Sequence, residues 1–235
     1  MIAHNLIRIR QQIEAACVKT GRNPQEITLV AATKGRSIEQ VQQALEFGIT
    51  DIGESRIQEA IVKHSKLLNS QALRWHMLGH LQTNKVKEAV KIFDLIQSVD
   101  TTRLAAEIDT QAFKIHKIQD ILVEVNISGE LSKYGFTPEE TIEAVKRIAK
   151  FRNLNIKGLM TIAPSVDNRE ETRPYFLTLR ELQNKINALR ITPACSAGRQ
   201  DALRILSMGM SDDFEAAIEE GSTMIRLGRA IFSRQ

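Results

Sequence analysis

The sequence predicts a single-domain α/β protein, a (β/α)₈ TIM barrel. Two observations predict this fold. Short apolar, β-branched runs recur from Ile27 onwards, and segments with helical periodicity separate them for most of the way. Strands that alternate with helices in this manner pair in parallel through right-handed crossovers, and eight such units close into a barrel.

The predicted elements of the barrel occupy residues 27–232. We expect strands at residues 27–33, 49–53, 74–79, 95–99, 121–127, 156–162, 204–208 and 223–227. We expect helices at residues 38–47, 57–69, 85–92, 101–114, 138–151, 172–188 and 212–220. In the seventh unit, residues 191–194 could add a short strand before residues 196–201. The alternative fold is an open doubly wound sheet, but no GxGxxG motif follows the first strand and no P-loop is present.

An amphipathic helix is expected before the barrel, at about residues 2–20. Charged residues interrupt its apolar positions, which are Ile2, Leu6, Ile9, Ile13 and Ala16. This is the pattern of a surface helix, and not of a signal peptide or a membrane span. No stretch is rich enough in Pro, Gly or Ser to be a linker, so residues 1–235 are expected to form one domain.

Composition places the chain among ordinary cytoplasmic proteins. Its hydrophobic fraction of 43% and charged fraction of 26% allow a sizeable core. The net charge of +4 is scattered along the chain, whereas nucleic-acid binding requires a clustered basic face, so we expect no nucleic-acid partner. Cys17 and Cys195 lie far apart without metal-ligand spacing, which indicates a reduced protein with neither disulfide nor zinc.

Ligands of such barrels bind at the C-terminal ends of the strands, so polar residues there are the candidates for function. They are Lys34, Glu54, Ser55, His80, Ser128, Thr161, Ser207, Ser211, Arg226 and Gly228. Lys34 follows the run ITLVAAT directly, and burial at the mouth of the barrel would depress its pKa. A lysine in that state can attack an aldehyde to form a Schiff base. A solvated lysine at a strand end is the alternative.

Residues 206–232 are the candidates for an anion site, because barrels often hold a phosphate between the loops after strands seven and eight. Ser207 offers a hydroxyl, and Gly209 and Gly228 allow close approach of the backbone. The N–H groups near Gly228 and Arg229 can surround an anion.

Other charged residues of this region are more ambiguous. Asp212 and Asp213 would repel a phosphate, so we expect them to cap the helix that follows Ser211. Arg226 either pairs with a carboxylate or points inward and donates hydrogen bonds. His76 and His80 are interpreted as pocket lining or packing, since no third ligand completes a metal site.

Six long motifs, in this order along nearly the whole chain, carry a resemblance to a known family. They are LVAATK, DIGESRIQEA, RWHMLGHLQTNK, VEVNISGELSKYGF, IKGLMTIAP and LSMGMSDDFEAAIEEGSTMIRLGRAIF. The chain closely resembles the pyridoxal phosphate homeostasis proteins, which have the barrel of the N-terminal domain of alanine racemase without its second, β-rich domain. The resemblance implies that Lys34 forms an internal aldimine with pyridoxal 5′-phosphate (PLP), that Arg226 faces the pyridine nitrogen, and that Ser207 with the backbone of Gly228 and Arg229 holds the phosphate.

The chain departs from the family pattern at three places. Ser55 stands where the family usually has Asn, which removes an amide contact near the cofactor. Arg229 stands where Thr is common, so a hydroxyl contact to phosphate is lost while the backbone N–H remains. The pair Gly35-Arg36 after Lys34 is also unusual.

The resemblance implies a PLP carrier that limits the free aldehyde and hands it to apo PLP-enzymes, not an enzyme. We also expect a cytoplasmic monomer without a membrane or nucleic-acid partner. The alternative is a PLP-dependent amino-acid racemase, which needs an acid or base on each face of the cofactor. In alanine racemases a tyrosine of the second domain is one of these. Tyr134 and Tyr175, the only tyrosines, lie in no matching motif.

Overall fold

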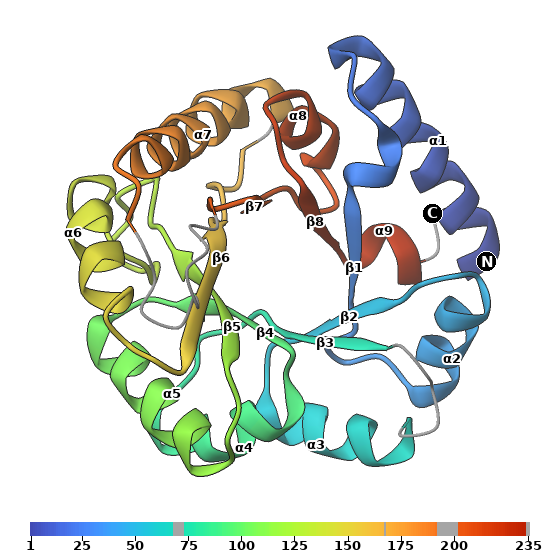
Figure 1. The fold of residues 1–235 in the computed structure, drawn as a ribbon. Coiled ribbons are helices and arrows are strands. Elements are labelled where there is room, and N and C mark those ends of the chain that lie inside the picture. Colours follow the sequence, from blue (N-terminus) through green and yellow to red (C-terminus); the bar gives the residue numbers. More distant parts are fainter. Residues whose placement is uncertain (68–72, 167, 192–201, 234–235) are drawn as a thin grey trace.

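Eight short apolar segments form the parallel strands of a closed barrel, and helices surround it (Figure 1). The computed structural model describes residues 1–67, 73–166, 168–191 and 202–233. The strands pair in sequence order, and β8 pairs with β1 to close the barrel. They are β1 Thr28–Ala32, β2 Asp51–Glu54, β3 Arg74–Met77, β4 Leu95–Val99, β5 Gln119–Glu124, β6 Leu154–Met160, β7 Ile205–Ser207 and β8 Met224–Leu227. The predicted fold class is confirmed.

All the helices except α9 lie where helical periodicity predicted them. They are α1 Ile2–Thr20, α2 Ile38–Glu46, α3 Ile57–Lys66, α4 Val86–Ile92, α5 Thr102–Lys114, α6 Pro138–Ile148, α7 Arg173–Ala188, α8 Phe214–Glu219 and α9 Arg229–Phe232. Three single 3₁₀ turns accompany them: η1 Pro24–Glu26, η2 Thr83–Lys85 and η3 Arg169–Thr172. Capping explains several starts, since Ser37 and Thr137 each form a capping box at the first turn of their helix.

The differences from the sequence prediction lie at the ends of elements. Three strands end two or three residues before their predicted ends, at Met77, Glu124 and Met160. The next residue of each still donates one backbone hydrogen bond to the neighbouring strand. The four-residue helix α9 was not predicted, since about one turn is too short to show helical periodicity. Cys195 and residues 192–201, which include most of the additional strand considered at 191–194, lie outside the described residues.

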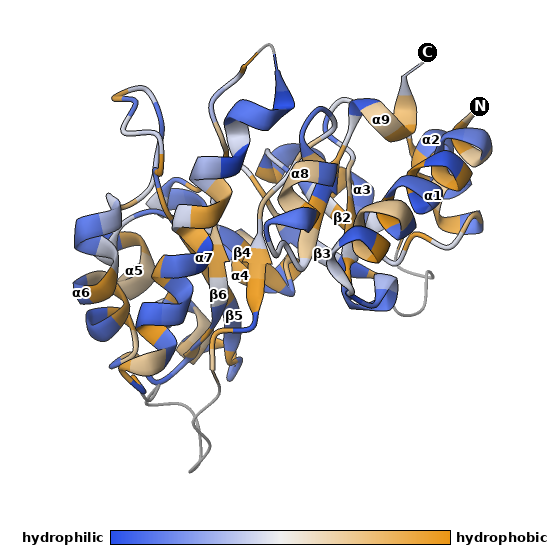
Figure 2. Cartoon of the chain, turned by 90° about the horizontal axis from the view of Figure 1, so that it is seen from above, coloured by the Kyte–Doolittle hydropathy of each residue, from blue (hydrophilic) through white to orange (hydrophobic). Residues whose placement is uncertain are grey.

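The core has two layers. A small cluster fills the barrel interior and consists of Val30, Leu95, Leu122, Met160 and Met224. A larger cluster lies between the outer faces of the strands and the helices, which carry hydrophilic residues on their other side (Figure 2). None of the helices in the described part of the chain is long and apolar enough to cross a membrane.

Helix α1 covers the seam of the barrel and packs against α8 and α9 (Figure 1). The Asn5 side chain donates hydrogen bonds to the carbonyl oxygens of Ile231, at 2.9 Å, and Ser233, at 3.2 Å. The N-terminal helix therefore holds α9, the element that follows β8 at the mouth of the barrel.

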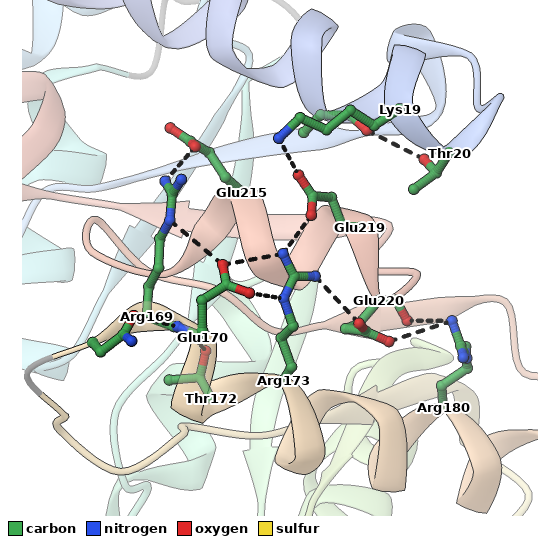
Figure 3. Close-up of polar contacts among 12 residues, drawn as sticks. Lys19, Thr20, Arg169, Glu170, Thr172, Arg173, Arg180, Glu215, Glu219 and Glu220 are labelled. Atoms are coloured by element: carbon green, nitrogen blue, oxygen red, sulfur yellow. Dashed lines mark hydrogen bonds and ion pairs between the residues drawn. The ribbon is translucent and has the colours of Figure 1, made fainter.

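A network of ion pairs joins α1, α7 and α8 on the outside of the molecule (Figure 3). Arg173 binds Glu170 at 2.5 Å, Glu219 at 2.5 Å and Glu220 at 3.3 Å, and Glu219 also binds Lys19 of α1 at 2.8 Å. The hydrogen bonds that Arg173 donates to Glu170 and Glu219 raise its pKa. Single surface pairs contribute little, but a network with one shared guanidinium fixes the relative positions of α1, α7 and α8.

Candidate functional site

The C-terminal ends of the strands bring most of the predicted site residues to one mouth of the barrel, because parallel strands all end on the same side. Lys34 follows β1, Thr161 follows β6, and Arg226 lies in β8. Glu54 is the last residue of β2, whereas the sequence placed it directly after that strand. Ser207 is the last residue of β7.

Lys34 lies two residues beyond β1, in a turn. It is exposed, so the burial expected from the sequence is not observed. Within the described part of the chain its ammonium group makes no hydrogen bond or ion pair. An exposed lysine without a partner at the mouth of the barrel is free to react with an aldehyde.

The turn that carries Lys34 is held on both sides. Lys63 Nζ donates to the carbonyl oxygen of Thr33 at 2.5 Å and to Glu54 Oε1 at 2.5 Å. The Thr33 hydroxyl donates to the same carboxylate oxygen, and the backbone N–H of Gly35 donates to Glu59 at 2.8 Å. The Lys63 and Glu54 side chains are only 7% and 0% exposed. This buried ion pair, which the sequence did not reveal, fixes the backbone before and after Lys34.

Arg226 points into the barrel mouth and is 6% exposed. Its guanidinium donates to Ser207 Oγ at 2.6 Å and to the carbonyl oxygen of Thr161 at 2.8 Å. No carboxylate of the described residues lies within ion-pair distance of it, so the second of the two predicted roles, inward donation, is the observed one. Burial lowers the pKa of Arg226 to about 10, against the opposing charges of Asp213 and Glu124, and the group stays charged at neutral pH.

Ser207 makes different contacts from those of a phosphate ligand. It is fully buried, accepts the hydrogen bond from Arg226, and donates its own proton to Gln97 Oε1 at 2.6 Å. A phosphate oxygen would have to displace one of these partners. The contacts of Ser207 serve to hold Arg226.

Ser211 lies within residues 206–232, the region in which the sequence predicts an anion site. Its hydroxyl accepts a hydrogen bond from the N–H of Ala230 at 3.1 Å, in the first turn of α9. Gly228, which precedes that turn, passes so close to β1 that an added Cβ would lie 3.3 Å from the carbonyl oxygen of Ala32. Backbone N–H groups at the start of α9 and the Ser211 hydroxyl thus face the same corner of the mouth.

The two acids after Ser211 do not cap the following helix with their side chains. Asp212 pairs with Arg229. Asp213 occupies the N-cap position of α8, but its carboxylate accepts the N–H of Met210 at 2.6 Å instead of one from the helix. Burial raises the pKa of Asp213. The expected capping bond is therefore absent. Asp213 closes the loop between β7 and α8, and Asp212 connects that loop to α9.

The two histidines have separate roles. His80 lies beyond the end of β3, where its Nδ1 is 2.7 Å from Asp100 and its ring stacks on Tyr134 with centroids 3.8 Å apart. His76 is buried inside the barrel beside Asp51. No group of three or more potential metal ligands occurs in the part of the chain that the structure describes.

Glu124, the last residue of β5, is a titratable group of the mouth that sequence reasoning missed. It is 6% exposed, and its Oε2 has no hydrogen-bond partner. Burial and, to a smaller extent, the charge of Asp100 raise the pKa of Glu124 to about 7, against the opposing effect of Arg226. A glutamate at the end of the apolar run DILVE was the available signal.

The raised pKa of Glu124 predicts a pH dependence of stability. The unfolded chain releases this proton near pH 4.5 and the folded chain near pH 7, so the stabilisation is full below pH 4.5 and is lost as pH rises through about 7. Relative to Glu124→Gln, the wild type should lose on the order of 3 kcal/mol of unfolding free energy between about pH 4 and about pH 8. Urea unfolding at both pH values measures this difference.

Glu143→Gln is the matched control. Glu143 is exposed on α6, and its hydrogen bond with Lys146 lowers its pKa, so the pH trend of its variant should be small and of opposite sign. A Glu124→Gln variant with the same pH dependence as the wild type would contradict the assignment.

A cavity of about 660 Å³ opens at the mouth beside α9. Its lining combines the cations Lys133 and Arg229 with the carboxyl groups of Glu130, Asp212 and Asp213. Cavities of this size hold cofactor-sized molecules. Lys34, Arg226 and Ser211 are not among its lining residues, so this cavity adjoins the predicted site residues and does not contain them.

Comparisons with known proteins show the family of the chain. The family model for the alanine racemase N-terminal domain matches residues 2–234. The pyridoxal phosphate homeostasis protein of Aquifex aeolicus is 40% identical over 230 residues, which cover 98% of this chain and 96% of the relative. That of Escherichia coli (strain K12) is 35% identical over 233 residues, with 98% and 95% covered.

Solved structures extend the likeness. PipY of Synechococcus elongatus, solved with PLP bound, superposes with a TM-score of 0.84 at 31% identity and covers 99% of this chain and 100% of its own. Alanine racemase of Clostridium difficile 630 superposes with a TM-score of 0.75 at 16% identity, covering 100% of this chain and 56% of the racemase, and so shares the fold. The chain belongs to the alanine racemase N-terminal domain family and, within it, to the pyridoxal phosphate homeostasis proteins.

Proposed function

We propose that this protein binds PLP through a Schiff base on Lys34 and carries or buffers the cofactor in PLP homeostasis. The observation that carries the proposal is the placement of Lys34, which is exposed and has no partner among the described residues. A buried ion pair fixes the turn that carries it, at the same mouth to which Arg226 directs its donors. PipY, at 31% identity, is described with PLP bound, which supports the same ligand here. PLP supplies the aldehyde with which the Lys34 amine combines.

The other residues have distinct parts in the proposal. Arg226 offers the N–H groups not used by Ser207 and Thr161 to the pyridine nitrogen. The Ser211 hydroxyl and the N–H groups near Gly228 and Arg229 hold the phosphate. Ser207, predicted from the sequence as a phosphate ligand, holds Arg226 instead.

We further propose that the protein carries PLP without turning over amino acids. A guanidinium opposite the pyridine nitrogen disfavours its protonation, and an unprotonated ring is a poorer electron sink. The alternative, an amino-acid racemase, requires a second proton-transfer group at the mouth. Tyr134 is there, but its ring stacks on His80.

Purified protein loaded with PLP is therefore expected to racemise L- or D-alanine no faster than free PLP does. Chiral chromatography after prolonged incubation measures this, and an apo PLP-enzyme in a second assay should regain activity when it receives the loaded protein. Turnover of about one per second, ordinary for an enzyme, would favour the racemase. In that case Tyr134→Phe would show whether Tyr134 supplies the second group.

The remaining expectations from the sequence stay predictions. They are a cytoplasmic location, a monomeric state, apo PLP-enzymes as acceptors and the absence of a nucleic-acid partner. Of the family departures, Ser55 is half-buried next to Gly79, whose added Cβ would lie 2.4 Å from the Ser55 carbonyl oxygen. Arg229 is engaged by Asp212.

A further inference from the structure

A chain of hydrogen bonds crosses the barrel interior and begins at Arg226. Its guanidinium donates to Ser207 Oγ at 2.6 Å, and Ser207 donates to Gln97 Oε1 at 2.6 Å. Gln97 Nε2 lies 3.0 Å from His76 Nδ1, and His76 Nε2 lies 2.9 Å from Asp51 Oδ1. Five side chains from β8, β7, β4, β3 and β2 are thus linked in series.

The chain has one direction. A guanidinium only donates, so the Ser207 hydroxyl accepts a hydrogen bond from Arg226 and must donate its own hydrogen bond to the Gln97 oxygen. The Gln97 amide nitrogen then donates to His76 Nδ1, which leaves the ring proton on Nε2, where it meets the Asp51 carboxylate. With this one arrangement of protons every member is satisfied.

The far end of the chain is a charged acceptor. Burial raises the pKa of Asp51, but hydrogen bonds from His76, Thr50 and Arg74 outweigh it, and the net pKa is lowered. Arg74, whose side chain is 61% exposed, binds both carboxylate oxygens, at 2.9 and 3.0 Å. Asp51 and Arg74 line a cavity of about 400 Å³ at the N-terminal end of the strands, so the chain joins the two ends of the barrel.

The chain runs through the apolar interior. From Arg226 to Asp51 no member is more than 6% exposed, and Gln97 is fully buried. Its amide also approaches Met224 Sδ, at 3.1 Å. An unpaired polar group in such surroundings is costly, so each link depends on the next one. Loss of Gln97 frees the Ser207 hydroxyl to turn and removes the fixed acceptor of Arg226.

We propose that Gln97 and His76 are positioning residues for Arg226, acting through this directed chain. The effect on cofactor binding rests on the proposed function, whereas the effect on Arg226 itself does not. Gln97 and His76 are both buried in the barrel interior.

The test compares Gln97→Leu with Gln119→Leu. Gln119 is an equally buried glutamine of β5, but its amide donates only to the backbone oxygens of Phe93, Asp94 and Asp120. In the protein without PLP, nitrogen-15 NMR should show neutral, Nε2-protonated His76 and separately resolved, slowly exchanging Arg226 guanidinium signals. Gln97→Leu should merge the Arg226 signals, as should the milder Ser207→Ala, while Gln119→Leu leaves them unchanged.

The second readout is PLP itself. Gln97→Leu should weaken PLP binding about tenfold, the effect of losing one hydrogen bond to a charged group, and shift the absorption maximum of the bound cofactor. Gln119→Leu should do neither. A wild-type His76 protonated on Nδ1, or Arg226 signals that respond equally to Gln97→Leu and Gln119→Leu, would overturn the proposal. Failure of the wild type to bind PLP would instead refute the proposed function and leave the NMR test standing.

Discussion

Lys34→Ala is expected to abolish covalent binding of PLP and to leave the fold intact. The amine is the proposed site of attachment, and the side chain is exposed and without partners in the described structure, so its removal disturbs no packing. Absorbance after mixing with PLP should show no band that borohydride removes. The thermal midpoint should stay within the range of a neutral surface substitution.

Lys133→Ala is the matched control, since Lys133 is a second lysine at the mouth but is paired with Glu130 at 2.7 Å. This variant should keep the borohydride-sensitive band. Persistence of the band in Lys34→Ala would show that another amine holds PLP, and unfolding of the variant would show that Lys34 has a structural role.

Lys63→Met is expected to cause the largest loss of stability. It leaves the Glu54 carboxylate, 0% exposed, without its cation, and removal of one partner from a buried pair costs about 3–5 kcal/mol. Glu54 Oε2 has no hydrogen-bond partner to compensate. The variant also loses the contact to the Thr33 carbonyl oxygen, so PLP affinity should fall as well.

Urea unfolding monitored by circular dichroism measures the effect of Lys63→Met. Lys146→Met serves as the control, because Lys146 pairs with Glu143 at 2.6 Å on the exposed side of α6 and surface pairs are worth about 1 kcal/mol or less. Similar small losses in both variants would mean that the buried pair does not fix the turn around Lys34.

The sequence predicted the barrel because alternating periodicity determines which segments are strands and which are helices. It placed Lys34 and Arg226 at the mouth because both follow or end apolar runs. It could not reveal that Lys34 is exposed, since exposure depends on how the neighbouring turns pack. Nor could it separate Ser207 from Ser211, because strand ends are uncertain by a few residues and one such shift moves a serine from the mouth into the interior.

The buried polar side chains of the barrel interior were predictable only in part. Asp51, Gln97 and Glu124 each interrupt or end an apolar strand run, and that is a sequence signal for a buried polar group. Their partners come from other strands, and no local pattern shows which strands bring them together. The pairing of Lys63 with Glu54 has the same origin, since α3 presents Lys63 to a residue nine positions earlier only after the helix has packed on the barrel.

Borohydride reduction of the wild-type protein with PLP, followed by mass spectrometry of its proteolytic peptides, tests the central claim most directly. Reduction converts a Schiff base into a stable secondary amine, so the modified lysine keeps its label through digestion. We expect a single pyridoxyl group, on the peptide that contains Lys34. A label on Lys63, Lys133 or any other lysine, or no label at all, would contradict it.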